Sequence, residues 1–174
     1  MLKDALTKAL NAQVNAEYYS AYLYLAMSAG ANQAGFKGTA NWLFVQAQEE
    51  MAHGTHIYQH ILERGGAPAF ADIKAPSTAF HCHSLKELFQ KVLEHERTVT
   101  ESIGNIASLA MREGDHASYN FIMWYVSEQI EEEGSVNDIL AKIALTEGSP
   151  GQLFTVDTEL GARVFVHPFG AGAA

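Results

Sequence analysis

Apolar residues recur every three to four positions over four long stretches of the chain, the pattern of amphipathic α-helices. The repeat is clearest in the third stretch, where one helical face collects Leu85, Leu88, Val92, Val99, Ile103, Ile106 and Ala110. Prolines and glycine-rich segments interrupt the pattern, and the intervals between them predict helices at about 4–30, 37–64, 84–113, 116–147 and 151–163. No alternating, strand-like pattern occurs, so the sequence predicts an all-α protein.

The lengths of the breaks predict how these helices are arranged. Short breaks join the first helix to the second and the third to the fourth, whereas about twenty residues, Gly65 to Ser84, join the second to the third. We therefore expect a four-helix bundle of two antiparallel hairpins with one long crossover, followed by a short fifth helix. The expected organisation is a single domain over 1–174, with the bundle at about 4–147, the fifth helix at about 151–163 and a flexible tail over 164–174.

Composition narrows the classes of partner. The net charge is −9 with only 11 Lys and Arg, so no basic stripe is available for nucleic acid, and cations are the expected partners. The single cysteine, Cys82, can form neither an internal disulfide nor a thiolate cage, which fits a reducing cytosol. The most apolar stretch, Tyr18 to Met27, is too short for a membrane span. We expect a cytoplasmic protein with no membrane and no nucleic-acid partner.

The candidate chemistry lies in polar residues that interrupt the apolar faces. Helical phase places a carboxylate, an imidazole or an amide on the core face of every long helix: Glu17, Glu50, His53, Glu96, Gln129 and Glu132. An isolated buried carboxylate would be protonated or excluded because burial strongly disfavours its charge. Several carboxylates converging in one core therefore indicate a bound cation.

The spacing of these residues strengthens that inference. Glu17 to Glu50 and Glu96 to Gln129 each span 33 positions, while Glu17 to His53 and Glu96 to Glu132 each span 36. Since a helix rises about 1.5 Å per residue, such a spacing runs up one helix and back down the next to the same height. The two hairpins are thus pseudo-repeats whose ligands meet at one level, the di-iron carboxylate arrangement of bundle enzymes, with Glu50 placed to bridge. Oxygen and imidazole ligands suit iron, with manganese or zinc as alternatives.

Other polar residues have a simpler interpretation. Glu94 points nearly opposite the core face that carries Glu96, so we interpret it as a solvated surface charge. His56 and His60 follow His53 at helical spacing but have no phase-matched carboxylates, and we expect them to face solvent. Residues 81–83, His-Cys-His, lie in the crossover and are interpreted as loop residues.

Four strings, NAEYYSAYLY, AQEEMAHGTHIY, LEHER and FIMWYVSEQIEEE, resemble the corresponding segments of bacterial non-haem ferritins in order and separation. The resemblance covers nearly the whole chain. It implies ferroxidase ligands at Glu17, Glu50, His53, Glu96, Gln129 and Glu132, third-iron carboxylates at Glu49, Glu128, Glu131 and Glu132, and an electron-donating tyrosine at Tyr24. It also implies that iron (Fe2+/Fe3+) is oxidised by dioxygen or peroxide and stored as ferric oxyhydroxide in a hollow homo-oligomer of 24 subunits.

Related cages are the alternatives. Bacterioferritins bind haem through a methionine in a context similar to that of Met51, but they carry a second Glu-x-x-His where this chain has Gln129-x-x-Glu132, so no haem is expected. A rubrerythrin-like peroxidase would need a cysteine-rich module that one cysteine excludes. A DNA-protecting cage would place iron between subunits, and the intrachain ligand set argues against it.

The turn before the fourth helix carries Glu113, Asp115 and His116. Ferritins build threefold pores near this turn, and an acidic mouth would concentrate cations. The competing interpretation is that Asp115 caps the N-terminus of the fourth helix.

Overall fold

The computed structural model describes residues 2–76, 84–146 and 149–170. Within them the chain forms five α-helices: α1 (Asp4–Gln33), α2 (Lys37–Glu63), α3 (Leu85–Glu113), α4 (His116–Leu145) and α5 (Pro150–Leu160). These bounds agree with the predicted helices to within three residues at every end. The described residues contain no strand, and the all-α prediction is confirmed. The residues 81–83 lie outside the described part of the chain.

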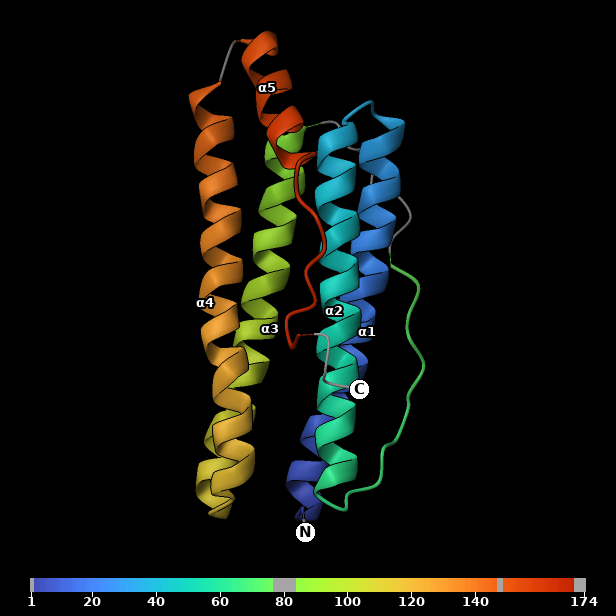
Figure 1. The fold of residues 1–174 in the computed structure, drawn as a ribbon, viewed down its shortest axis with the longest axis vertical. Helices are drawn as coiled ribbons and strands as arrows, with labels where there is room; N and C mark the ends of the chain where they lie inside the picture. Colours follow the sequence, from blue (N-terminus) through green and yellow to red (C-terminus); the bar gives the residue numbers. More distant parts are fainter. Residues whose placement is uncertain (1, 77–83, 147–148, 171–174) are drawn as a thin grey trace.

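The long helices pair as α1 with α2 and α3 with α4, and the two pairs stand side by side (Figure 1). The segment after α2, described as far as residue 76, runs outside the α1–α2 pair and back along part of the bundle (Figure 1). Its start is fixed by Asn11, whose side-chain nitrogen donates to the Ala67 carbonyl at 3.0 Å and whose side-chain oxygen accepts from the Ala69 amide at 2.8 Å. The predicted topology of two hairpins and one crossover is thus confirmed.

The apolar core consists of two clusters separated along the bundle axis. The cluster nearer α5 includes Tyr24, Leu43, Phe89, Val92, Val136 and Leu160, and the other includes Leu6, Leu10, Ile57, Ile61, Ile103 and Ile122. On each long helix the predicted ligands lie in sequence between the residues of the two clusters: Glu17, Glu50, His53, Glu96, Gln129 and Glu132. The clusters supply the hydrophobic stabilisation of the fold, and they enclose a polar layer in the middle of the bundle.

The turn between α3 and α4 is built to end one helix and begin the next. Gly114 adopts the left-handed conformation, with φ of 68°, that commonly terminates a helix. Asp115 accepts a hydrogen bond from the Ser118 amide at 3.0 Å and pairs with Arg64 at 3.0 Å, so it caps α4. Glu113 pairs with Lys3 at 2.9 Å. These contacts favour the capping interpretation of Asp115.

The fifth helix lies across the end of the bundle and is hydrogen-bonded to the start of α2 (Figure 1). The Asp157 carboxylate accepts hydrogen bonds from the amides of Gly38 (3.0 Å) and Thr39 (2.8 Å) and from the Thr39 hydroxyl (2.7 Å). The first-turn amides of α2, which have no partner within their own helix, are satisfied in this way. Gly38 is required by the close approach, because a Cβ there would lie 1.5 Å from the Asp157 carbonyl oxygen.

The chain beyond α5 differs from the expectation of a flexible tail from residue 164. Residues 161–170 return along α2, and the partly buried Phe169 packs against the core cluster that contains Ile57 and Ile122. Packing of residues 164–170 was not expected, because an extended segment that packs on helices carries no periodic signal. Residues 171–174 lie outside the described part.

None of the described helices is both long enough and apolar enough to cross a membrane.

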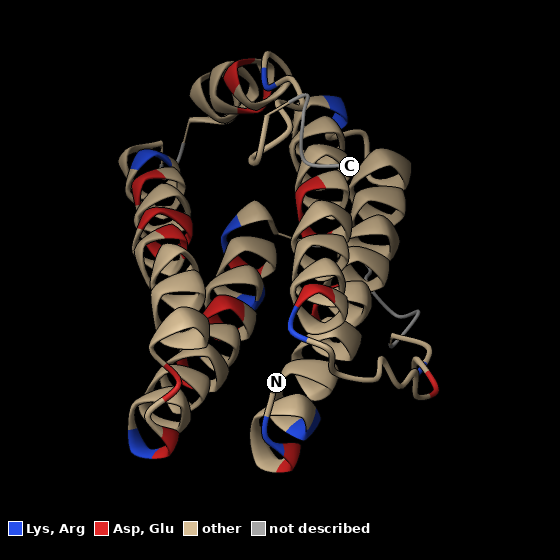
Figure 2. Cartoon of the chain, turned by 60° about the horizontal axis from the view of Figure 1, so that its bottom comes forward, with Lys and Arg blue, Asp and Glu red and all other residues tan. Residues whose placement is uncertain are grey.

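Figure 2 shows acidic residues recurring along α4, whose middle carries Glu128, Glu131, Glu132 and Glu133.

Candidate metal centre

All six predicted ligands are buried in the polar layer of the bundle. The set consists of Glu17 from α1, Glu50 and His53 from α2, Glu96 from α3, and Gln129 and Glu132 from α4, with exposed fractions between 1% and 6%. The phase argument is confirmed most directly on α3, where Glu96 is buried while Glu94, two residues away, is exposed.

Glu17, Glu50 and His53 form the tightest group. One ligand atom from each lies within 4.8 Å of the other two, and the His53 Nδ1 is 3.4 Å from a carboxylate oxygen of Glu50. Two buried atoms of this group, Glu17 Oε2 and His53 Nε2, have no hydrogen-bond partner among the described residues. Buried polar atoms are rarely left unpaired because each one costs free energy. A cation bound between the three side chains would satisfy both atoms.

Glu96 and Gln129 form the opposite side of the layer. The Gln129 amide nitrogen donates to a Glu96 carboxylate oxygen at 3.1 Å and to the Glu96 carbonyl at 3.2 Å. The Tyr24 hydroxyl donates a short hydrogen bond to the other Glu96 carboxylate oxygen. Tyr24, the predicted electron-donating tyrosine, therefore contacts the predicted ligand Glu96 directly.

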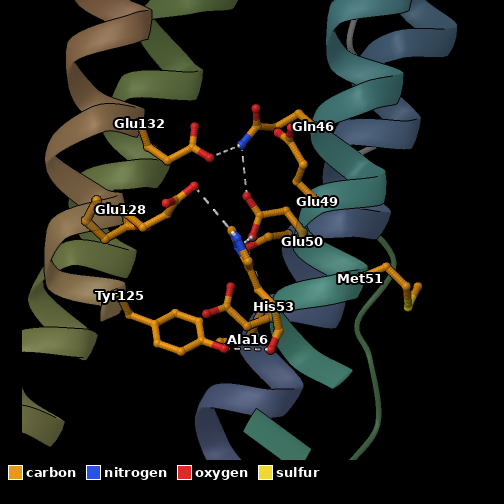
Figure 3. Close-up of polar contacts among 12 residues, drawn as sticks. Ala16, Gln46, Glu49, Glu50, Met51, His53, Tyr125, Glu128 and Glu132 are labelled. Carbon is orange, nitrogen blue, oxygen red and sulfur yellow. Dashed lines mark hydrogen bonds and ion pairs between the residues drawn. The ribbon is translucent and has the colours of Figure 1, made fainter. Parts of the chain in front are cut away.

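Gln46, which sequence reasoning missed, joins the two sides. Its amide nitrogen donates to Glu132 at 2.8 Å and to Glu50 at 3.1 Å (Figure 3). Gln13 holds Glu17 in the same manner, with a distance of 2.9 Å. Each glutamine precedes its glutamate by four residues, and the two glutamines are themselves 33 positions apart. The pseudo-repeat that identified the ligands therefore also contained the signal for these two supporting residues.

The electrostatics of the layer favour a bound cation. Burial raises the pKa of Glu17 and Glu50, and repulsion between neighbouring carboxylates raises both further. Burial likewise raises the pKa of Glu96 and takes that of Glu132 to about 8, with the charge of Glu96 as the next cause for Glu132. Burial of four carboxyl groups in one layer thus disfavours their charged forms, and a bound cation would offset that cost.

The predicted third-iron carboxylates are arranged less uniformly. Glu128 extends from α4 towards α2, with a carboxylate oxygen 4.0 Å from His53 Nε2 (Figure 3). Glu49 is partly buried and forms an ion pair with Arg163 of the C-terminal segment. Glu131 is exposed on α4. Their role as a third iron site remains a prediction.

The expectation for His56 and His60 was wrong. His60 is buried, with Nε2 at 3.0 Å from the Ser118 hydroxyl, and the half-buried His56 lies 2.9 Å from the Tyr125 hydroxyl. Burial lowers the pKa of each imidazole to about 4, so both are neutral at neutral pH. Both face α4, which supplies the Ser118 and Tyr125 partners, and the pattern of α2 alone does not reveal partners on another helix.

Met51 lies on another face of α2. Its side chain is 49% exposed and points away from the carboxylates (Figure 3).

Comparison with known proteins agrees with this geometry. A family model described as a ferritin-like domain matches residues 7–146. A probable bacterial non-heme ferritin-like protein of Haemophilus influenzae is 39% identical over 161 residues, covering 92% of this chain and 96% of the relative. A bacterial non-heme ferritin of Escherichia coli is 38% identical over 160 residues, with the same coverage of 92% and 96%.

Solved structures give the same result at the level of the fold. The open-pore ferritin of Archaeoglobus fulgidus superimposes with a TM-score of 0.91 at 40% identity, covering 94% of this chain and 100% of that one. An engineered closed form of the same ferritin gives 0.91 at 40% identity over 95% of this chain and 100% of that one. By sequence and fold together, the chain belongs to the ferritin family and is similar to its bacterial non-haem members.

Proposed function

We propose that this protein stores iron, and that it oxidises Fe(II) at a di-iron centre formed by Glu17, Glu50, His53, Glu96, Gln129 and Glu132. The observation that carries the proposal is the pair of unpartnered buried atoms, Glu17 Oε2 and His53 Nε2, beside the Glu50 carboxylate. Burying these carboxylates and unpaired atoms destabilises the metal-free protein, and a bound cation would offset that destabilisation. Similarity to bacterial non-haem ferritins supports iron as that cation.

The two sides of the layer suggest how two Fe(II) ions are held. Glu17 and His53 would bind one iron, Glu96 and Glu132 the other, and Glu50 would bridge them. Gln46 supports the bridging arrangement, because it is hydrogen-bonded to Glu50 and Glu132 at once. The side chains supply negative charge and fixed positions in a water-poor enclosure, while the two electrons that reduce dioxygen or peroxide come from the two irons.

Tyr24 is placed to assist the oxidation. Its hydroxyl donates to Glu96, and burial raises the pKa of the phenol well above its usual value, so the group remains protonated. We propose that it serves as an electron donor next to the centre, the role that the resemblance implies.

Storage would take place inside a homo-oligomeric shell, for which the resemblance implies 24 subunits. A face formed by α1 and α2 supports association, because Tyr22, Leu25, Phe44 and Met51 are each 42% to 49% exposed. Large apolar side chains gathered on one face indicate a protein interface. Assembly, storage as ferric oxyhydroxide and a cytoplasmic location are parts of the same proposal.

Two variants of α3 test the proposal. Glu96→Ala should lose rapid Fe(II) oxidation, because a buried ligand is removed, while Glu94→Ala should retain it, because that carboxylate is exposed. Absorbance of the ferric product after mixing with air-saturated buffer reports the rate, and gel filtration confirms that both variants assemble. Full activity in Glu96→Ala with loss in Glu94→Ala would refute the assignment of the site.

A further inference from the structure

The C-terminal segment, residues 161–170, runs beside α2 and contacts both α2 and α4. In Figure 1 it descends from α5 beside α2. Val164 and Val166 are 72% and 70% exposed, while Arg163, Phe165 and Phe169 are partly buried, so alternate side chains face the helices. The segment is extended and has a definite inner face.

Two groups of contacts hold the segment to α2, one on each side of the centre. At its start, the Asn41 amide donates to the Arg163 carbonyl at 2.8 Å, and the Arg163 guanidinium lies 4.5 Å from the centre of the Trp42 ring. At its end, the Phe169 ring packs 3.6 Å from the His56 ring and 4.5 Å from the Trp124 ring of α4. Glu49, Glu50 and His53 lie between Asn41 and His56 on α2, so the segment passes over the ligands.

Arg163 makes the decisive contact. Its guanidinium donates to the Gln46 side-chain oxygen at 2.7 Å and forms a short ion pair with a carboxylate oxygen of Glu49. The two charged side chains are only 25% and 17% exposed, so solvent screens the pair weakly. Gln46 in turn bonds Glu50 and Glu132, which links Arg163 to the centre through one side chain.

We propose that the Arg163 guanidinium takes the place of a third metal ion at Glu49, so that the subunit binds two metal ions tightly and admits a third only when the segment leaves. The inference rests on the proposed di-iron centre. It follows from charge and geometry: a metal ion at Glu49 would need the oxygen that Arg163 holds and would be repelled by the guanidinium. Residues 161–170 thus control access to Glu49, because a third metal ion can bind there only after the segment has moved away with Arg163.

Zinc(II) binding to the assembled, metal-free protein tests this proposal without any oxidation step, since zinc accepts carboxylate and imidazole ligands and has no redox chemistry. Equilibrium dialysis should give two tightly bound zinc ions per subunit in the wild type. Arg163→Gln should bind a third ion about tenfold or more tightly than the wild type does, the size expected when a partly buried, charge-assisted hydrogen bond is lost. Adding Glu49→Gln to that variant should abolish the gain.

The matched control is Arg97→Gln, which removes an arginine that pairs with Glu133 at 3.7 Å and is 61% exposed. It should leave zinc binding unchanged. In the wild type, hydrogen exchange of amides 161–170 should speed up only when zinc exceeds two ions per subunit. Equal affinity for the third ion in the wild type and Arg163→Gln, or a gain that survives Glu49→Gln, would overturn the proposal while leaving the di-iron centre intact. Loss of the two tight ions in every protein would overturn both.

Discussion

Replacing Glu132 with glutamine removes one buried charge from the metal centre while preserving its shape. Burial raises the pKa of Glu132 from 4.5 to about 8, helped by the charge of Glu96. The Gln46 amide donates to a Glu132 oxygen at 2.8 Å, and the carbonyl oxygen of a glutamine can accept the same hydrogen bond. The variant therefore resembles the protonated form of Glu132 at every pH.

The magnitude follows from the two pKa values. A carboxyl group that titrates near 8 in the fold and 4.5 in the unfolded chain costs about 5 kcal/mol when it is ionised in the metal-free fold. Below pH 4.5 both states hold the proton and the cost is absent. Between pH 4.5 and 8 the unfolded chain releases the proton first, so the free energy of unfolding falls as pH rises, and above pH 8 the full cost remains.

Thermal unfolding of the metal-free proteins at pH 5 and pH 8.5 measures this difference. The Tm of the wild type should fall between the two conditions by about 10 °C more than that of Glu132→Gln, given about 2–4 °C for each kcal/mol in a chain of this size. Glu131→Gln is the matched control, since its carboxylate is the adjacent, exposed one, and it should follow the wild type. Parallel falls in the wild type and Glu132→Gln would refute the electrostatic reasoning.

Three further predictions concern individual contacts. Glu50→Ala and His53→Ala should each abolish rapid Fe(II) oxidation in stopped-flow absorbance while gel filtration shows intact assemblies; rapid oxidation in either variant would exclude that residue as a ligand. Tyr24→Phe should still bind Fe(II) anaerobically but oxidise it more slowly over repeated turnovers, and an unchanged rate would remove the proposed electron donor. Asp157→Ala should lower the free energy of unfolding by about 1–2 kcal/mol or more, because the first-turn amides of α2 and the Thr39 hydroxyl lose their acceptor. Chemical denaturation measures that loss, and unchanged stability would mean that water replaces the carboxylate.

The helices and the ligand layer were predictable because both depend on regular spacing. Helical phase separated Glu96 from Glu94, and the equal separations in the two hairpins placed Glu17 and Glu50 at one level with Glu96 and Gln129. A helix has a fixed rise and rotation per residue, so the spacing of 33 residues predicted the relative heights of the ligands on paired helices.

Contacts that depend on the path of an irregular segment were not predictable in this way. Arg163 and Glu49 are 114 positions apart, and their ion pair exists because α5 turns the chain back along α2. The sequence of residues 161–170 has no helical period that would have indicated a packed segment. His56 and His60 were misjudged for a related reason, because their partners Tyr125 and Ser118 belong to another helix.

The most direct test of the central claim is anomalous diffraction from crystals soaked anaerobically in Fe(II), with data collected at the iron absorption edge. Two iron positions per subunit are expected inside the four-helix bundle, one beside Glu17 and His53 and one beside Glu96 and Glu132, with the Glu50 carboxylate in contact with both. Iron found only on the outer surface, or a ligand layer that stays empty at saturating Fe(II), would contradict the account.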